Sequence, residues 1–566
     1  MKKRILSVVL CSVMVMLCSC GKEVTEEKKP QISSLSEAEA LAQWEEAKTT
    51  PYGKYPEPVI YTLGKLAGTN NSNMPNGDTY EDNAYTRYLS EMLNIQNDDV
   101  FEELDVQYYR SIDMSISSGT IPDIMVVEDA DTVAKLYDLD LIQDLSEAYE
   151  NCSTDVIKNI YKSYGDEIFA PVTFNGKLMA IPETSISEGP NLLWLRKDWL
   201  DKLGLSEPKT VEDVENIIRA FITENPGQNA PGETIGLVSN TSLCGDNGIS
   251  LEYQLDILFA NFGAFPKQWI YDENGRVRYG SVTPQAKEGL AYVREWYEEG
   301  LLDENFLLRT DTNIVDLIVN GKCGSFFGPW WAPNNPLMEA VAKNPEAEWV
   351  PYLIQTNEDG KTYYHSQNPG YKYVVVRKGF EHPEIVCKMI SVIFDYMRYE
   401  DVDNEEMSDY FVLNVDPTAR PIAINVDYNT ALQRCYDMLQ EAFRGREAYE
   451  DMPLLERSYY NACKAYLRNG EDATVEEWAA YQSRVVACSL LDDEKICEVP
   501  SLFFGETEGM RSNWWKLEEM ENSAYLKIIC GEEDISYFDT FVENWKEAGG
   551  NEITTEVSRV LRERGK

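Results

Sequence analysis

Hydrophobic and polar positions alternate in blocks through the first third of the chain, beginning near residue 50. Continuous apolar runs at residues 59–63 and 122–127 predict buried strands, and residues 82–93 repeat their apolar positions with a helical period. We interpret residues 105–109 as a further strand. Because strands and helices alternate, the pattern predicts an α/β fold with a mostly parallel sheet.

Further along the chain, several helices carry their own start signals. Thr210 and Asp213 form a capping-box pattern, and Thr283 stands before a proline, which suits the first turn of a helix. Residues 538–561 predict two amphipathic helices divided by a pair of glycines. The polar stretch at 271–279, with Asn-Gly near its centre, predicts a hairpin with a type I′ turn.

The first twenty residues have the composition of a secretory signal. Three basic residues precede an apolar stretch that is too short to span a bilayer comfortably. The stretch ends at Cys20, in a sequence that resembles the lipobox of bacterial lipoproteins, where this cysteine is lipidated. We therefore expect a signal peptide over residues 1–19 and a lipid anchor with a flexible tether over residues 20–50. An uncleaved membrane anchor is the alternative.

The chain is strongly acidic, since 97 Asp and Glu against 51 Lys and Arg give a formal net charge of −46. Binding a nucleic acid, or anionic lipid through a basic patch, needs the opposite charge, so we expect neither. The sequence contains two histidines, His365 and His382. This small number argues against metal sites built of several histidines and against histidine-dependent catalytic triads. Nine scattered cysteines follow Cys20 and do not suggest a disulfide framework, although Cys488 and Cys497 could be bridged.

Common catalytic motifs are absent from the sequence. It contains no G-x-S-x-G, no H-E-x-x-H, no C-x-x-C and no Walker A pattern. A pair of carboxylates of the glycosidase type stays open, because two acidic residues can meet in space from any two positions. We therefore predict a protein that is not an enzyme, with a secreted carbohydrate-active enzyme as an alternative.

Five segments spread over the chain carry a family resemblance. They contain SGTIPDI, NGKLMAIP, LWLRKDWLDKLGL, GKCGSFFGPWW and GGNEITTEV, at residues 118–124, 175–182, 193–205, 321–331 and 549–557. In order and spread they resemble the extracellular solute-binding proteins of bacterial ABC importers, family 1. More narrowly, they are similar to the large lipoprotein branch that includes alginate- and oligosaccharide-binding proteins.

This resemblance implies two interrupted α/β lobes of the periplasmic-binding-protein type, joined by crossing segments and closing over a ligand by a hinge motion. The expected bounds are 51–187 with 366–440 for lobe 1 and 188–365 with 441–566 for lobe 2, with crossings near 184–195 and 352–371. The resemblance also implies a monomer, anchored outside the cell membrane, that binds a carbohydrate and passes it to permease subunits. A peptide or another solute is the alternative ligand.

The resemblance also indicates residues for the ligand, because aromatic rings pack on sugar faces while charged side chains bind the hydroxyls. The candidate ligand-binding residues are Trp330, Trp331, Trp269, Asp123, Glu183, Arg511 and Trp514. Most have a structural alternative. The tryptophans can pack inside a lobe, Asp123 can cap the backbone at a strand entry, and the segment around Arg511 can form a C-terminal domain contact.

Relatives in this branch often carry an acidic calcium loop after the helix that contains Phe221. Residues 225–236 keep the Thr-Ile-Gly end of that pattern but lack nearly all of its carboxylates, with Glu224 and Glu233 as exceptions. Calcium needs several oxygen ligands with charge among them. We therefore expect no cofactor, and a calcium site that is absent or weak.

Overall fold

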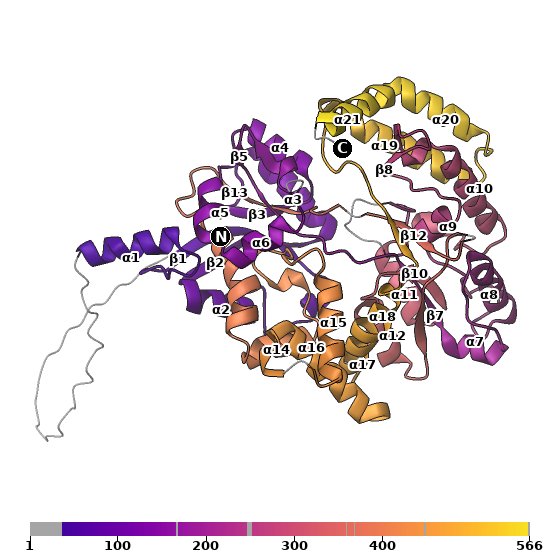
Figure 1. The fold of residues 1–566 in the computed structure, drawn as a ribbon, viewed down its shortest axis with the longest axis horizontal. Helices are drawn as coiled ribbons and strands as arrows, with labels where there is room; N and C mark the ends of the chain where they lie inside the picture. The colour runs from indigo at the N-terminus through magenta and orange to yellow at the C-terminus, as the bar shows by residue number, and fades with distance from the viewer. Residues whose placement is uncertain are drawn as a thin grey trace, which may run out of the picture. The chain divides into compact units, whose positions relative to one another are not determined.

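The computed structural model describes most of the chain beyond residue 36 (Figure 1). The described residues are 37–165, 168–245, 252–357, 359–366, 368–446 and 449–563. The predicted signal peptide, Cys20 and the first part of the tether lie outside them. One compact unit runs from Gln43 to Lys566, and the residues up to Ala42 form a separate unit. In the described ranges, no helix is long and apolar enough to cross a membrane.

Lobe 1 is built on a five-stranded sheet in the order β2-β1-β3-β13-β6. The strands are β1 (Val59–Ala67), β2 (Ile95–Leu104), β3 (Ile124–Val127), β6 (Ile181–Pro182) and β13 (Tyr373–Val376). β1 runs parallel to β2 and β3, whereas β13 runs antiparallel to β3 and β6. The sheet is therefore completed by a strand that returns after a long excursion of the chain.

Helices accompany this sheet and close one apolar core. They are α1 (Glu37–Thr49), α2 (Ala84–Leu93), α3 (Asp105–Ser118), α4 (Ala130–Asp138), α5 (Ser146–Cys152), α6 (Asp155–Lys162) and α13 (Ile385–Ser391). The core draws most of its buried residues from 47–181 and 373–426. Lobe 1 is therefore interrupted in sequence.

The strand predicted at residues 105–109 is wrong, because these residues begin helix α3. Tyr108, Ile112 and Ile116 recur every four residues and are all buried, so the burial of one helical face decides the structure. The strand that precedes the helix is β2, which lies at the edge of the sheet and carries four acidic residues. An acidic edge strand escapes a search for apolar runs.

Lobe 2 contains a three-stranded sheet with β7 (Leu192–Arg196) at its centre. β10 (Ser325–Gly328) and β11 (Trp349–Tyr352) flank it, and both run antiparallel to it. The prediction of a mostly parallel sheet is therefore wrong for this lobe and holds in lobe 1 only for its first three strands. The late strands reach their sheets after long excursions, and only a direct β-helix-β crossover imposes the parallel direction.

The helices of lobe 2 come from two distant parts of the chain. They are α7 (Lys197–Leu203), α8 (Val211–Glu224), α9 (Asp256–Ala260), α10 (Pro284–Glu298), α11 (Asp311–Val319), α12 (Met338–Lys343), α19 (Glu508–Ile529), α20 (Tyr537–Trp545) and α21 (Asn551–Glu563). Thr210 and Asp213 form the predicted capping box, and the Thr283 hydroxyl accepts a hydrogen bond from the N–H of Ala286. Both predicted helix starts are confirmed.

The predicted hairpin is formed by β8 (Trp269–Tyr271) and β9 (Val277–Tyr279). Its turn is not of type I′, because Gly275 has a φ of +72° while Asn274 stays outside the left-handed region. An Asn-Gly turn with both residues at positive φ occurs instead at Asn175 and Gly176, between β4 (Thr173–Phe174) and β5 (Lys177–Leu178).

A run of helices follows the second crossing and connects the cores. It comprises α14 (Glu405–Val412), α15 (Ala431–Phe443), α16 (Leu454–Asn469), α17 (Val475–Tyr481) and α18 (Cys488–Leu491). Leu454 belongs to the core of lobe 1, whereas Leu432 and Cys488 pack with residues of lobe 2. β12 (Thr362–His365) and β14 (Ile496–Val499) form a parallel pair. Cys488 and Cys497 are both free thiols in the structure. The exact lobe bounds stay predictions.

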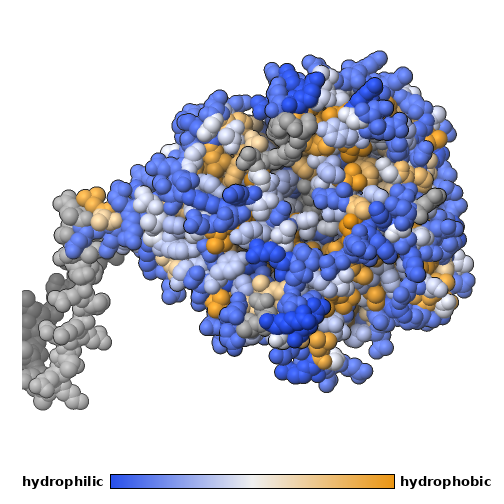
Figure 2. Space-filling model, in the orientation of Figure 1, coloured by the Kyte–Doolittle hydropathy of each residue, from blue (hydrophilic) through white to orange (hydrophobic). Residues whose placement is uncertain are grey.

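Charge and polarity dominate the visible surface. Figure 2 shows one face covered mainly by hydrophilic residues, with apolar residues in small separate groups. This distribution agrees with the strongly acidic composition of the chain.

Candidate functional site

Three stretches of chain are hydrogen-bonded to one another where lobe 1 connects to lobe 2. Residues 183–191 lead from β6 to β7, residues 368–372 lead back to β13, and residues 425–429 form the third stretch. Backbone hydrogen bonds of 2.6–2.9 Å tie residues 183–187 to residues 369–372 and 425–429. Parts of the two predicted crossing segments are therefore joined to each other and to residues 425–429 by backbone hydrogen bonds.

The Glu183 carboxylate already has two partners within this hydrogen-bonded unit. Its side chain is fully buried, one carboxylate oxygen accepts a hydrogen bond from the N–H of Asn425 at 2.9 Å, and the other lies 3.3 Å from the Lys372 ammonium. These contacts tie the crossing segments together. A direct role of Glu183 in ligand binding stays a prediction.

Trp331 and Glu188 form a polar contact between a crossing segment and lobe 2. Trp331 follows β10, and its indole N–H donates to the Glu188 carboxylate at 3.3 Å. Both side chains are half-buried. Burial raises the pKa of Glu188 to about 7, against the lowering effects of the Trp331 hydrogen bond and of the Arg484 charge. The hydrogen bond orients the Trp331 ring, which packs at the margin of an apolar core of lobe 2.

Trp330 differs from its neighbour because it is buried. The Arg484 guanidinium lies 4.3 Å from the centre of its ring and 4.0 Å from that of Tyr459, so Arg484 is held between two aromatic rings. The preceding turn is anchored by a hydrogen bond of 3.1 Å from the Trp194 indole to the Pro329 carbonyl oxygen. These contacts favour the packing alternative for Trp330.

Further side chains gather around Glu188. Burial raises the pKa of Glu252 to about 8, and the charges of Asp311 and Glu188 add to that effect. Burial also raises the pKa of Tyr371, with smaller contributions from Glu183, Glu188 and Tyr109 of α3. The charge of Glu188 therefore contributes to the raised pKa values of both Glu252 and Tyr371.

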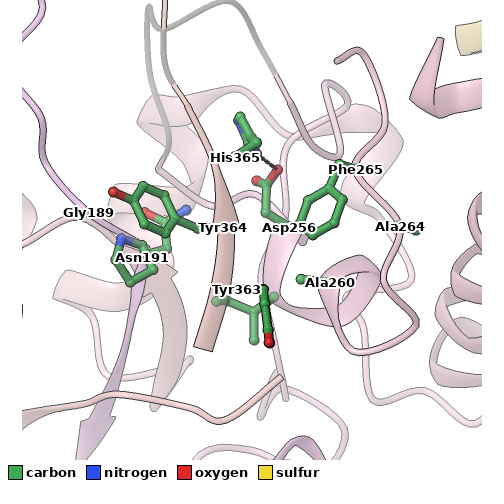
Figure 3. Close-up of a pocket in the computed structure, with 11 residues that line it drawn as sticks. Gly189, Asn191, Asp256, Ala260, Ala264, Phe265, Tyr363, Tyr364 and His365 are labelled. Carbon is green, nitrogen blue, oxygen red and sulfur yellow. Dashed lines mark ion pairs between the residues drawn. The ribbon is translucent and has the colours of Figure 1, made fainter. Parts of the chain in front are cut away.

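A small pocket lies beside this region (Figure 3). Gly189, Asn191 and Tyr364 lie on one side of β12, and the buried His365 lies on the other, 3.5 Å from the Asp256 carboxylate. Burial lowers the pKa of His365 and raises that of Asp256. The cavity measures about 20 Å³, which is room for little more than one water molecule. In this conformation it cannot hold a sugar ring.

Trp269 and Trp514 belong to a packed aromatic cluster in lobe 2. Their rings stack with centres 5.9 Å apart, Tyr279 lies 5.1 Å from Trp269 and 5.0 Å from Trp514, and Trp545 lies beside both Tyr279 and Trp514. Trp269 is buried and Trp514 is half-buried. These contacts favour the packing alternative for both tryptophans.

Arg511 stands at the start of α19 with an exposed side chain, and its Nε donates to the Glu506 carboxylate at 2.8 Å. Burial raises the pKa of Glu506 to about 7, and the Asp131 carboxyl of α4 raises it further. An acidic group of lobe 1 therefore approaches an acidic group of lobe 2 here.

Asp123 immediately precedes β3 and is held on both sides. One oxygen accepts hydrogen bonds from the N–H and the hydroxyl of Thr62 at 2.9 and 2.7 Å, and the other accepts from the Arg377 guanidinium at 2.5 Å. These hydrogen bonds and the Arg377 charge hold the pKa of Asp123 below its usual range, although burial opposes them. The contacts match the strand-entry alternative.

The loop at 225–236 is closed by its own side chains. The Asn225 side-chain oxygen accepts from the Asn229 N–H at 3.0 Å and from the Thr234 hydroxyl at 2.7 Å. The Lys202 ammonium donates to the Pro226 carbonyl oxygen at 2.6 Å. Amide groups, a hydroxyl and an ammonium thus make the hydrogen bonds of this loop. Within the described residues, no group of three or more His, Cys, Asp or Glu could hold a metal ion.

Glu188, Glu252 and Tyr371 were not among the predicted site residues. A signal existed for Glu188, since it lies inside the predicted crossing segment and precedes Gly-Pro. Glu252 and Tyr371 come from distant positions, and their proximity depends on the tertiary fold.

These features define a binding protein with two α/β lobes and a candidate site on the segments that join them. A family model for the bacterial extracellular solute-binding proteins matches residues 101–395, just over half of the chain. The chain belongs to this family. Its members bind a solute without converting it, so the protein is not an enzyme.

Curated relatives extend the likeness. The chain is 23% identical over 394 residues to the polygalacturonan/rhamnogalacturonan-binding protein YtcQ of Bacillus subtilis (strain 168), covering 69% of this chain and 72% of that one. It is 22% identical over 465 residues to the lipoprotein LipO of the same organism, covering 81% and 84%.

Solved structures share the fold. The alginate-binding protein AlgQ2 without calcium ion aligns with a TM-score of 0.61 at 14% identity, covering 90% of this chain and 98% of that one. The Streptococcus pneumoniae substrate-binding protein FusA in complex with kestose aligns with a TM-score of 0.58 at 15% identity, covering 89% and 99%. The expected two-lobed α/β fold is thereby confirmed.

Proposed function

We propose that this protein captures an oligosaccharide between its lobes and delivers it to the permease of an ABC importer. The observation that carries the proposal is the Trp331 ring, held by Glu188 next to the crossing segments. An oriented aromatic face beside a carboxyl group suits a sugar ring and its hydroxyls. The likeness to YtcQ, which binds polygalacturonan and rhamnogalacturonan, to the alginate-binding AlgQ2 and to FusA in complex with kestose supports the same ligand class.

Hinge motion supplies the mechanism. The crossing segments are joined by backbone hydrogen bonds, so they can bend as a unit while each lobe keeps its core. Ligand bound to groups of both lobes stabilises the closed form, because only that form makes all contacts.

We further propose that Cys20 carries a lipid that anchors the protein outside the cell membrane as a monomer. The lipobox-like sequence and the likeness to LipO support this anchoring. Permease subunits are the expected partners for release of the ligand.

The test is a binding screen with the purified protein lacking residues 1–20, because the lipid is not needed for recognition. Neutral and acidic oligosaccharides, peptides and amino acids are compared by calorimetry and by the shift of the melting temperature. We expect micromolar or tighter binding of at least one oligosaccharide. Binding of peptides alone would contradict the proposal, and release of reducing ends would contradict the assignment as a pure binder.

A further inference from the structure

A second cavity lies in lobe 2, where the ends of helices α11 and α12 meet strand β11, and it shares no residue with the candidate ligand site. It measures about 160 Å³. A cavity of about 150 Å³ can hold a benzene molecule, so there is room here for a small ion. The apolar part of its lining includes the buried residues Ile318, Ala340, Ala347 and Trp349.

The charged groups of this cavity are all cations. Among the described residues that line it, none is acidic, although the chain contains 97 acidic residues. Arg196 and Lys343 both belong to the lining. A cavity with two cations in a chain of net charge −46 is a local exception to the composition, and it favours a negatively charged occupant.

Arg196 is fixed in place and keeps donors to spare. It is the last residue of β7 and is 6% exposed. Its Nε and Nη2 donate to the two carboxylate oxygens of Asp198 at 2.7 and 2.6 Å. The third nitrogen, Nη1, has no hydrogen-bond partner in the described chain and lies beside Gly321 in the cavity lining, where a Cβ atom would stand 3.7 Å from it. The buried indole N–H of Trp349 is a further donor without a partner among the described residues.

The side-chain acceptors of the lining are already used. The Lys343 ammonium donates to the Asn320 side-chain oxygen at 2.6 Å, and the Asn344 side-chain oxygen accepts from the Glu346 N–H at 3.3 Å. The ammonium has three hydrogens, so donors remain on Lys343 after this contact. The polar side chains around the cavity therefore offer hydrogen-bond donors to an occupant and no free acceptor.

We propose that this cavity binds a small oxyanion, of the chemistry shared by phosphate and sulfate. The ion accepts hydrogen bonds from Nη1 of Arg196 and from the Lys343 ammonium, which are charge-assisted and therefore stronger than neutral ones. The carbonyl ends of α11 and α12 oppose an anion, but each carries about half a charge, against the full charges of the two side chains. Because Lys343 is exposed and Arg196 shares its charge with Asp198, we expect an affinity in the millimolar range.

Calorimetry tests this site with inorganic phosphate and inorganic sulfate as the probes. The purified protein without residues 1–20 is titrated at an ionic strength held constant with sodium chloride, so that screening does not change. Lys343→Gln removes one cation at an exposed position, whereas Ala340→Leu keeps both cations and fills the space. Lys527→Gln is the matched control, because Lys527 is also an exposed lysine in the last turn of a helix.

We expect saturable binding of one ion by the wild type, weakened about fivefold or more in Lys343→Gln by the loss of a charge beside the ion. Ala340→Leu should abolish binding, and Lys527→Gln should leave it unchanged. No saturable binding by the wild type would overturn the inference, as would an equal affinity in Ala340→Leu. An equal loss in Lys343→Gln and Lys527→Gln would show an effect of net charge only and would overturn it too. If Ala340→Leu does not fold, the comparison of the two lysine variants decides the result.

Discussion

Two tryptophans of this protein lie next to a glutamate, and their surroundings differ. Trp331 donates its indole N–H to Glu188 and meets no other aromatic ring among the described residues. Trp514 lies near Glu518, whose pKa burial raises to about 7, but its ring contacts Trp269, Tyr279 and Trp545. The first ring is oriented by a hydrogen bond at the margin of one apolar core, whereas the second lies inside a cluster of aromatic rings.

The comparison shows that neighbouring tryptophans in the sequence do not by themselves identify a surface on which a sugar ring can pack. Both regions contain paired tryptophans in the sequence, at residues 330–331 and 514–515. What separates them among the described residues is whether other aromatic rings stack on or lie against the tryptophan ring. The following changes test that distinction, beginning with the largest expected effect.

Trp269→Ala should destabilise the protein by about 3–5 kcal/mol, because it removes a buried ring from a packed aromatic cluster. The folded fraction should bind glycans with unchanged affinity. Urea unfolding followed by calorimetry on the folded protein measures both. A large loss of affinity at unchanged stability would move the binding site to this cluster.

Trp331→Ala should weaken glycan binding by about tenfold to a hundredfold, since the platform for a sugar face is removed. Its effect on stability should stay near 1 kcal/mol, because the ring is half-buried. Trp331→Phe keeps a ring but lacks the N–H that donates to Glu188, and should give an intermediate affinity. Equal affinities of Trp331→Ala and the wild type would exclude this residue from the site.

The stability of the region around Trp514 and Arg511 should depend on pH through Glu506, which pairs with Arg511. The folded-state pKa of Glu506 is about 7, above its ordinary value of 4.5, because burial and the Asp131 carboxyl oppose ionisation. The folded state therefore holds this proton more tightly than the unfolded chain, and the free energy of unfolding falls as the pH rises from about 4.5 to about 7. Glu506→Gln should flatten that decline when urea unfolding is measured across the range. A decline as steep as that of the wild type would contradict the assignment.

Removal of calcium should have the smallest effect on stability of the changes considered. The loop at 225–236 is closed by Asn225, Asn229 and Thr234, with the Lys202 ammonium on a backbone carbonyl oxygen. Adding EDTA or calcium chloride should shift the melting temperature by less than about 1 °C. A stabilisation by calcium of several degrees, lost in Asn225→Ala, would show that the loop binds the ion.

Local signals in the sequence predicted much of the fold. The capping residues Thr210 and Thr283 satisfy backbone groups within one turn, so they act wherever the helix is placed. The run before Val127 is buried on both faces and forms β3 as predicted. By contrast, the direction of β10 and β11 depends on where distant segments return, which no local pattern encodes.

The candidate site was less predictable for the same reason. The turn before Trp331 predicts a ring at a candidate site, and in the structure this ring is half-buried and hydrogen-bonded to Glu188. Trp330 has the same local sequence and is buried, because Arg484, more than 150 residues later, packs on its ring. The place of Glu188 in a predicted crossing segment before Gly-Pro was a weak signal, because only the tertiary fold shows that Trp331 is its hydrogen-bond partner.

The most direct test of the central claim is a crystal structure of the protein with the oligosaccharide that binds most tightly in the screen. We predict a sugar ring packed against the face of Trp331, with a hydroxyl group within hydrogen-bond distance of the Glu188 carboxyl. A sugar bound instead at Trp514 and Arg511, with Trp331 free of ligand, would contradict the account.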